Sequence, residues 1–161
     1  MYDENNSTDF RRYERMPIYQ KAMDIVQIVD SICALIPDDD PILKDIKDFM
    51  MADSYVIPAK IAGAEGGDLY DIRMENATLI RKAARELVVQ TNGLAIHGFE
   101  EPEYFKLLRQ EIEEFRLLFK DWISTFDPLN YIMDRWGLFN PPGMEFQEDE
   151  PEAEEPPPEP F

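Results

Sequence analysis

Four stretches of the 161-residue sequence repeat apolar residues at steps of three and four, and this period restricts the fold more than any other feature. It places an apolar stripe along one side of an α-helix, and such a stripe has to be buried against other helices. Proline, glycine and aspartate separate the stretches, as is typical of helix ends. We therefore predict an all-α fold, an antiparallel up-down four-helix bundle over residues 16–127.

The expected helices cover residues 17–36, 41–62, from 68 to about 92, and 102–126. Pro58 lies inside the second helix and is expected to kink it. Gly93 is expected to end the third helix in a left-handed conformation. The side chains expected in the core are Ile18, Ala22, Ile25, Val29, Ile32 and Ile36, then Ile46, Phe49, Met50, Ile57 and Ile61, then Ile72, Leu79, Ile80, Ala83, Leu87 and Leu94, and finally Phe105, Leu108, Ile112, Phe115, Phe119, Trp122 and Phe126.

Three segments flank the expected bundle. Residues 1–15 are predicted to form a flexible polar arm, and residues 128–143 a short helix or docking strap. Residues 144–161 contain eight acidic residues, many prolines and no lysine or arginine. Because such a composition buries too little apolar surface to offset chain entropy, we expect a disordered acidic tail.

The chain is strongly acidic, with 34 acidic and 16 basic residues and a net charge of −18. Without the tail the count is 26 against 16, so the rest of the chain is acidic too. Nucleic acid and anionic membranes are repelled by such a charge unless basic residues gather on one face. Two clusters form a candidate anion or nucleic-acid patch if they converge: Arg11, Arg12 and Arg15, and Arg81, Lys82 and Arg85. The alternative, which the net charge favours, is a solvated face paired with local carboxylates.

Residues for metal or catalytic sites are scarce. A di-iron bundle site requires two Glu-x-x-His pairs, whereas His97 is the only histidine and the residue three before it is Leu94. Cys33, the only cysteine, lies among apolar residues and is expected to be a buried, unreactive side chain. We expect no metal, no cofactor and no enzymatic activity. Because the single cysteine has no partner for a disulfide within the chain, we expect a cytoplasmic location. The sequence contains no apolar run of the kind that forms a secretion signal or spans a membrane.

Asp53, Lys60 and Glu86 form a candidate buried polar network, because Asp53 and Glu86 lie beside the expected core seams. Either the network lines a ligand pocket, or it sets helix register or a subunit contact. The second interpretation is favoured.

The last residues of the tail, Pro160 and Phe161, are similar to the acidic C-terminal tips of bacterial single-stranded-DNA-binding proteins. Those tips dock into basic pockets on partner proteins. The resemblance implies a partner-docking tail, and the alternative is a solubilising spacer.

Three motifs occur in order: residues 18–25 (IYQKAMDI), residues 57–62 (IPAKIA) and residues 86–90 (ELVVQ). Together they resemble the four-helix-bundle proteins encoded in intervening sequences of bacterial 23S ribosomal RNA genes, a family related to the accessory variability determinant protein of diversity-generating retroelements. The sequence departs from the family pattern at Lys60, where asparagine is usual, and at Gly63, where glutamate is usual. The resemblance implies the bundle and a ring-like homo-oligomer, such as a pentamer.

Two functions remain open from the sequence. The first is a non-enzymatic, homo-oligomeric helical scaffold that binds a protein partner. The second is an accessory factor that binds RNA, single-stranded DNA or a reverse transcriptase. A segregated basic face would favour the second, and an evenly acidic surface would favour the first.

Overall fold

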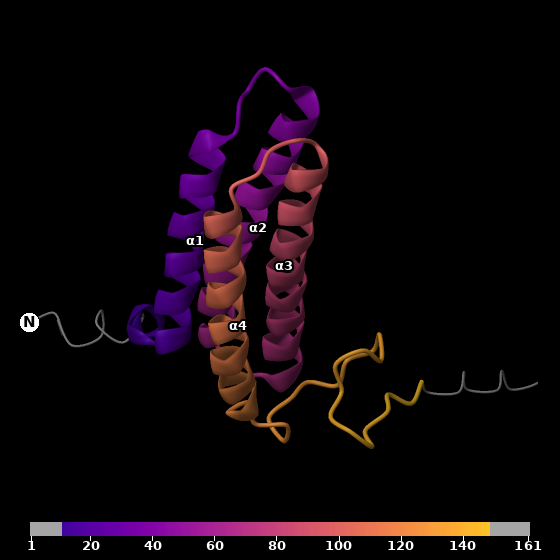
Figure 1. The fold of residues 1–161 in the computed structure, drawn as a ribbon. Helices are drawn as coiled ribbons and strands as arrows, with labels where there is room; N and C mark the ends of the chain where they lie inside the picture. The colour runs from indigo at the N-terminus through magenta and orange to yellow at the C-terminus, as the bar shows by residue number, and fades with distance from the viewer. Residues whose placement is uncertain (1–10, 149–161) are drawn as a thin grey trace, which may run out of the picture.

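The computed structural model describes residues 11–148. It contains a short 3-10 helix, η1 (Arg12–Arg15), and four α-helices, α1 (Pro17–Leu35), α2 (Pro41–Glu65), α3 (Tyr70–Ile96) and α4 (Pro102–Ser124). No strand occurs within this described range, so the predicted all-helical fold is confirmed. Short turns join the α-helices, and consecutive α-helices run in opposite directions along the bundle (Figure 1).

Proline starts three of the four helices, as the sequence predicts. Pro17, Pro41 and Pro102 each lie in a first helical turn. Asp40 precedes Pro41, and its carboxylate accepts hydrogen bonds from two backbone N–H groups of the first turn of α2, at 3.0 and 3.1 Å. This cap satisfies donors that have no partner inside the helix. Further along, α2 continues through Pro58 to Glu65.

Two helix ends differ from the prediction. Gly93 lies inside α3, which continues to Ile96, and the left-handed glycine is Gly98, with φ of +86°. The prediction that Gly93 ends the helix is therefore wrong. The extra turn is favoured because it carries Leu94, which is fully buried in the core. Gly63 likewise lies within α2 rather than after it.

The core lies between the four helices and contains most of the predicted seam residues. In α1 the seam from Ile18 to Ile36 is buried. This helix packs against both α2 and α4, which explains why its apolar stripe is wide without requiring another molecule.

Phe49, Ile72 and Leu79 were expected in the core but are exposed, with 63 %, 46 % and 38 % of their surface accessible. In α2 the buried stripe passes through Met50 instead of its neighbour Phe49. In α3 the small residue Ala77 is buried. A helix buries only one stripe against each neighbour, and apolar residues next to that stripe stay at the surface.

Packing between the helices is uneven. Helix α3 packs chiefly against α2, while α4 packs chiefly against α1, and α3 and α4 contact each other only sparsely. The α1–α4 contact includes Lys21, whose Nζ lies 2.8 Å from a carboxylate oxygen of Glu111 and 2.7 Å from one of Glu114. The α3–α4 side of the bundle is therefore its most open side.

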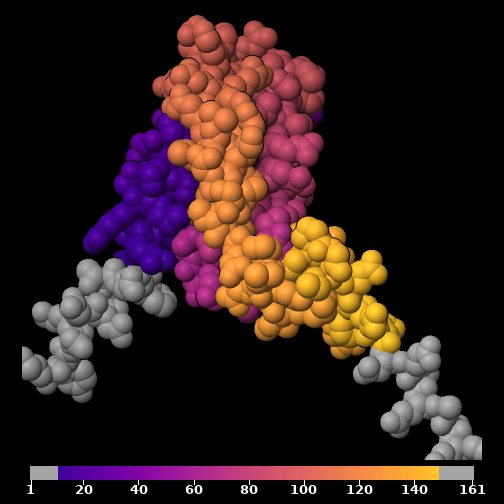
Figure 2. All heavy atoms as spheres, turned by 90° about the horizontal axis from the view of Figure 1, so that it is seen from below, coloured from indigo at the N-terminus to yellow at the C-terminus, as the bar shows by residue number. Residues whose placement is uncertain are grey.

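Residues 128–143, which we call the strap, contain turns but no helix. The strap is joined to the start of α3 by a hydrogen bond from the Tyr70 N–H to the Asn130 carbonyl oxygen, at 2.7 Å. Figure 2 shows this segment, in orange to yellow, beside the lower end of the bundle. The tail residues Pro160 and Phe161 lie outside the described range.

None of the helices in the described part is both long and apolar enough to cross a membrane.

Candidate functional site

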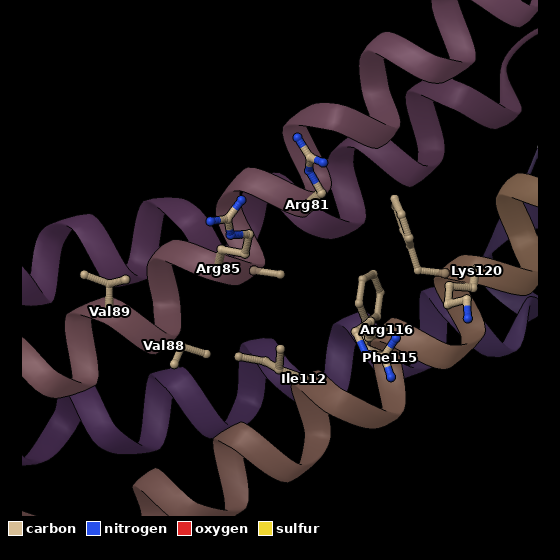
Figure 3. Close-up of a pocket in the computed structure, with 10 residues that line it drawn as sticks. Arg81, Arg85, Val88, Val89, Ile112, Phe115, Arg116 and Lys120 are labelled. Carbon is tan, nitrogen blue, oxygen red and sulfur yellow. The ribbon is translucent and has the colours of Figure 1, made fainter.

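An open groove of about 590 Å³ lies where α3 and α4 separate. Figure 3 shows side chains from both helices converging on it. Its surface is almost entirely apolar. The lining residues are Arg81, Ala84, Arg85, Val88 and Val89 from α3, and Ile112, Phe115, Arg116, Phe119 and Lys120 from α4.

The sequence explains why the groove forms here. On α3, Ala84 contributes only a methyl group to the lining, while Phe115 and Phe119 contribute rings from α4, and the space between the helices is left open. Val88 and Ile112 line the groove from its two sides (Figure 3). A well-packed interior leaves few voids, so an apolar hollow of this size at the surface requires an explanation.

Four cationic side chains surround the apolar floor. Arg81 and Arg85 come from α3, while Arg116 and Lys120 come from α4. Arg116 is neutralised by Glu113, with the ion pair at 2.6 Å. Within residues 11–148, Arg81, Arg85 and Lys120 take part in no ion pair. These cations make the groove rim locally positive, although the chain as a whole has a net charge of −18.

The arrangement can hold a ligand by burial and charge. Its lining residues carry no carboxylate, imidazole, thiol or hydroxyl group. Apolar groups of a ligand would be removed from water on the floor, and anionic groups would lie against the rim.

Only part of the predicted basic patch contributes to this groove. Arg81 and Arg85 line it, whereas Lys82 pairs with Glu86 on its own helix, at 2.6 Å. Arg12 and Arg15 belong to η1, which packs against α1 and α2, and Arg11 directly precedes it. The arm arginines therefore line no part of the groove.

Sequence reasoning missed Arg116, Lys120 and the apolar floor. A signal was present, because Arg116 follows Phe115 and Lys120 follows Phe119, which places two cations beside the aromatic seam of α4. Arg116 and Lys120 are four positions apart, and the same spacing separates Arg81 and Arg85 on α3. What the sequence did not indicate is that these two helices face each other without close packing.

The candidate polar network has different partners from those expected. Asp53 accepts a hydrogen bond from the side-chain amide of Gln90 at 2.7 Å. Burial raises the pKa of Asp53, and the nearby Glu86 carboxylate raises it further. The Gln90 Oε1 atom is buried and has no hydrogen-bond partner among residues 11–148. Lys60 takes part in no ion pair within the described residues.

A second polar cluster, which sequence reasoning missed, joins three helices. Glu65 Oε1 lies 2.6 Å from Arg73 Nη2 and accepts a hydrogen bond from Trp122 Nε1 at 2.7 Å. The Arg73 guanidinium also stacks over the Phe126 ring, at 4.1 Å from its centroid. All four side chains are largely buried, so the cluster is a structural contact.

No group of three or more histidine, cysteine, aspartate or glutamate side chains in the described part is arranged to hold a metal ion. No protein-family model matches the chain, and no curated protein shows significant sequence similarity to it.

Proposed function

We propose that the chain is a non-enzymatic helical scaffold that binds a protein partner through the α3–α4 groove. The partner would contribute an amphipathic segment that carries large apolar side chains together with carboxylates. The observation that carries this proposal is the combination of an apolar floor with three rim cations, Arg81, Arg85 and Lys120, that form no ion pair with any of residues 11–148.

The composition of the groove favours a protein segment over nucleic acid. Nucleic-acid affinity comes mainly from many phosphate contacts, which would require an extended basic surface. Here the cations are few and surround an apolar floor, and Lys82 and the arm arginines lie outside it. An amphipathic helix laid in a groove uses both features, since its apolar face is buried while its charged flanks remain at the rim.

Self-association and a cytoplasmic location belong to the same proposal. The motifs that resemble the 23S ribosomal RNA intervening-sequence family support a homo-oligomer, and the exposed apolar residues Trp136 and Leu138 provide surface for it. A role as an RNA or single-stranded-DNA accessory factor is the competing function, and the experiment below separates the two.

Binding is tested by fluorescence anisotropy with three labelled probes. The first is a designed helix of leucine and glutamate, about 18 residues or five turns long, with its leucines on one face. The second replaces every glutamate with lysine, and the third is single-stranded oligothymidylate. At about 0.15 M salt, where long-range attraction is screened, we expect only the glutamate peptide to bind the groove.

Charge reversal localises the binding. Arg81→Glu/Arg85→Glu changes two exposed side chains of the rim. It should weaken the binding of the glutamate peptide by about tenfold or more, equivalent to ~1.4 kcal/mol. Arg12→Glu/Arg15→Glu on η1 is the matched control and should bind as the wild type does. Equal binding by the α3 variant would overturn the proposal. If oligothymidylate binds and the α3 variant abolishes that binding, the nucleic-acid function replaces it.

A further inference from the structure

The strap presents an apolar tip that no part of residues 11–148 covers. Trp136 is 95 % exposed and Leu138 is 71 % exposed, and we call these two residues the tip. Soluble proteins rarely leave a tryptophan fully in water, and tryptophan is the residue most enriched in binding hot spots. The two residues of the tip are therefore candidates for contact with another molecule.

Hydrogen bonds hold the tip in place. The Asp134 carboxylate accepts the backbone N–H groups of Trp136, Leu138 and Phe139, at 2.8 to 2.9 Å. Asn140 closes the loop, because its side chain accepts the Asp134 N–H at 2.7 Å and donates to the Asp134 carbonyl at 3.0 Å. A loop fixed in this way loses little conformational entropy when its tip binds.

The strap is also fixed to the bundle. The Asn130 side chain donates to the Asp68 carbonyl oxygen at 3.2 Å, and the Tyr70 N–H donates to the Asn130 carbonyl oxygen at 2.7 Å. The tip lies beside the first turns of α3, where Trp136 and Leu138 share a cleft with Asp71, Ile72 and Glu75. No strap residue lines the α3–α4 groove, so within one molecule the groove and the tip leave each other uncovered.

The tip and the groove are complementary in polarity and charge. The groove has an apolar floor and the rim cations Arg81, Arg85 and Lys120. The tip is apolar and shares its cleft with three carboxylates, those of Asp71, Glu75 and Asp134. None of these carboxylates takes part in an ion pair within the described residues. Because the chain as a whole repels its own copies, self-association requires a local match of opposite charge such as this one.

We propose that the tip of one copy, Trp136 and Leu138, inserts into the α3–α4 groove of a second copy. In that contact Asp71 and Glu75 of the first copy lie against the cationic rim of the second. The inference rests on the proposed function, in which the groove takes an acidic amphipathic protein segment, and it names that segment as the strap of another copy. The contact joins two different surfaces, so each assembly keeps a free tip and a free groove unless it closes on itself.

The test measures mass by sedimentation from low concentration up to about 0.1 mM, a range that detects micromolar contacts. The wild type should exceed the monomer mass of 18.8 kDa as the concentration rises. Trp136→Ala should weaken association by about thirtyfold or more, the effect of losing a hot-spot tryptophan. Arg81→Glu/Arg85→Glu should also weaken association, because it removes two cations from the rim of the groove. Phe49→Ala, at an exposed apolar site on α2, is the matched control and should associate normally.

Mixing the two weakened variants gives the sharpest result. The Trp136→Ala protein keeps an intact groove, and the Arg81→Glu/Arg85→Glu protein keeps an intact tip. Their equimolar mixture should form dimers of one copy of each, although neither protein associates alone. Circular dichroism checks that both variants remain helical. The substituted side chains are exposed, so both variants are expected to fold.

Any of four outcomes would overturn the inference. Three of them are a wild type that stays monomeric, a Trp136→Ala variant that associates normally, and a mixture that forms no dimer. A fourth is that the monomer binds the leucine–glutamate peptide only after deletion of residues 149–161, which would make the tail of the same chain the occupant. If the peptide binds Trp136→Ala but the wild type remains monomeric, the proposed function stands and this inference fails. If neither the peptide nor a second copy binds, both fail.

Discussion

Trp122 of α4 donates its indole N–H to Glu65 at the end of α2, at 2.7 Å, across 57 positions of sequence. The same carboxylate oxygen pairs with Arg73 of α3 at 2.6 Å, so one atom ties together three helices. This contact explains why α2 continues past Gly63, because the last helical turn is the one that carries Glu65. It also holds the end of α4 to α2 and α3, at the end of the bundle where the strap begins.

Glu65→Ala is therefore expected to destabilise the fold strongly. It leaves the largely buried Arg73 charge without its partner, and breaking a buried pair in this way costs ~3–5 kcal/mol. Trp122→Phe keeps an aromatic ring but removes the indole N–H and the volume of its five-membered ring. The loss of the hydrogen bond alone should cost about 1–3 kcal/mol. Chemical denaturation measures both changes. Trp136→Phe, at the exposed tryptophan, is the control and should change the free energy of unfolding by less than ~0.5 kcal/mol.

Core and surface apolar residues should differ sharply in their contribution to stability. Leu87→Ala removes a fully buried side chain and should cost ~2–5 kcal/mol. Leu79→Ala, on the same helix, changes a side chain that is exposed although its sequence pattern predicted burial, and it should cost less than about 1 kcal/mol. Equal losses in thermal or chemical denaturation would contradict the burial described for α3.

Asp53→Asn should stabilise the protein at neutral pH. The pKa of Asp53 in the fold is raised above its ordinary value of 3.8 by burial, so the native state binds more protons than the unfolded chain between the two values. Stability consequently falls as the pH rises from 3.8 through the folded-state pKa, and asparagine removes this loss. The new amide could also donate to the unpartnered Gln90 Oε1, a gain of about 1 kcal/mol.

The measurement for Asp53 is the free energy of unfolding as a function of pH. The stability gained by Asp53→Asn should be present above the folded-state pKa of Asp53 and should shrink as the pH falls to 3.8. Asp48→Asn, at an exposed ion pair with Lys44, is the control and should change stability by less than ~0.5 kcal/mol. An advantage that does not depend on pH would leave only the hydrogen-bond explanation.

Cys33 should react with thiol reagents only when the fold opens. The side chain is buried in the core, and desolvation raises the pKa of its thiol to about 11. At about pH 8 the thiolate, which is the reactive form, is therefore both rare and shielded. Labelling by an aromatic disulfide reagent should be slow in the native protein and fast in denaturant. Fast labelling of the native protein would show that α1 separates from α2 far more often than this packing permits.

The sequence by itself determined the number, type and approximate limits of the helices and most of the core. The three- and four-residue period is set by helix geometry, and Pro17, Asp40 and Pro102 act on neighbouring backbone groups, so these signals are local and readable. Helix ends were less predictable. Gly93 favours a stop locally, but the burial of Leu94 in the core outweighs that preference.

Only the tertiary structure decided which apolar residues stay exposed and where the groove lies. Phe49 and Met50 are both large apolar residues, and the rotation of α2 against its neighbours selects Met50 for the core. Arg81 and Lys120 are 39 positions apart in sequence, and they share a rim because α3 packs on α2 while α4 packs on α1. Such relations depend on how helices pack against one another, and the period of a single helix carries no information about its neighbours.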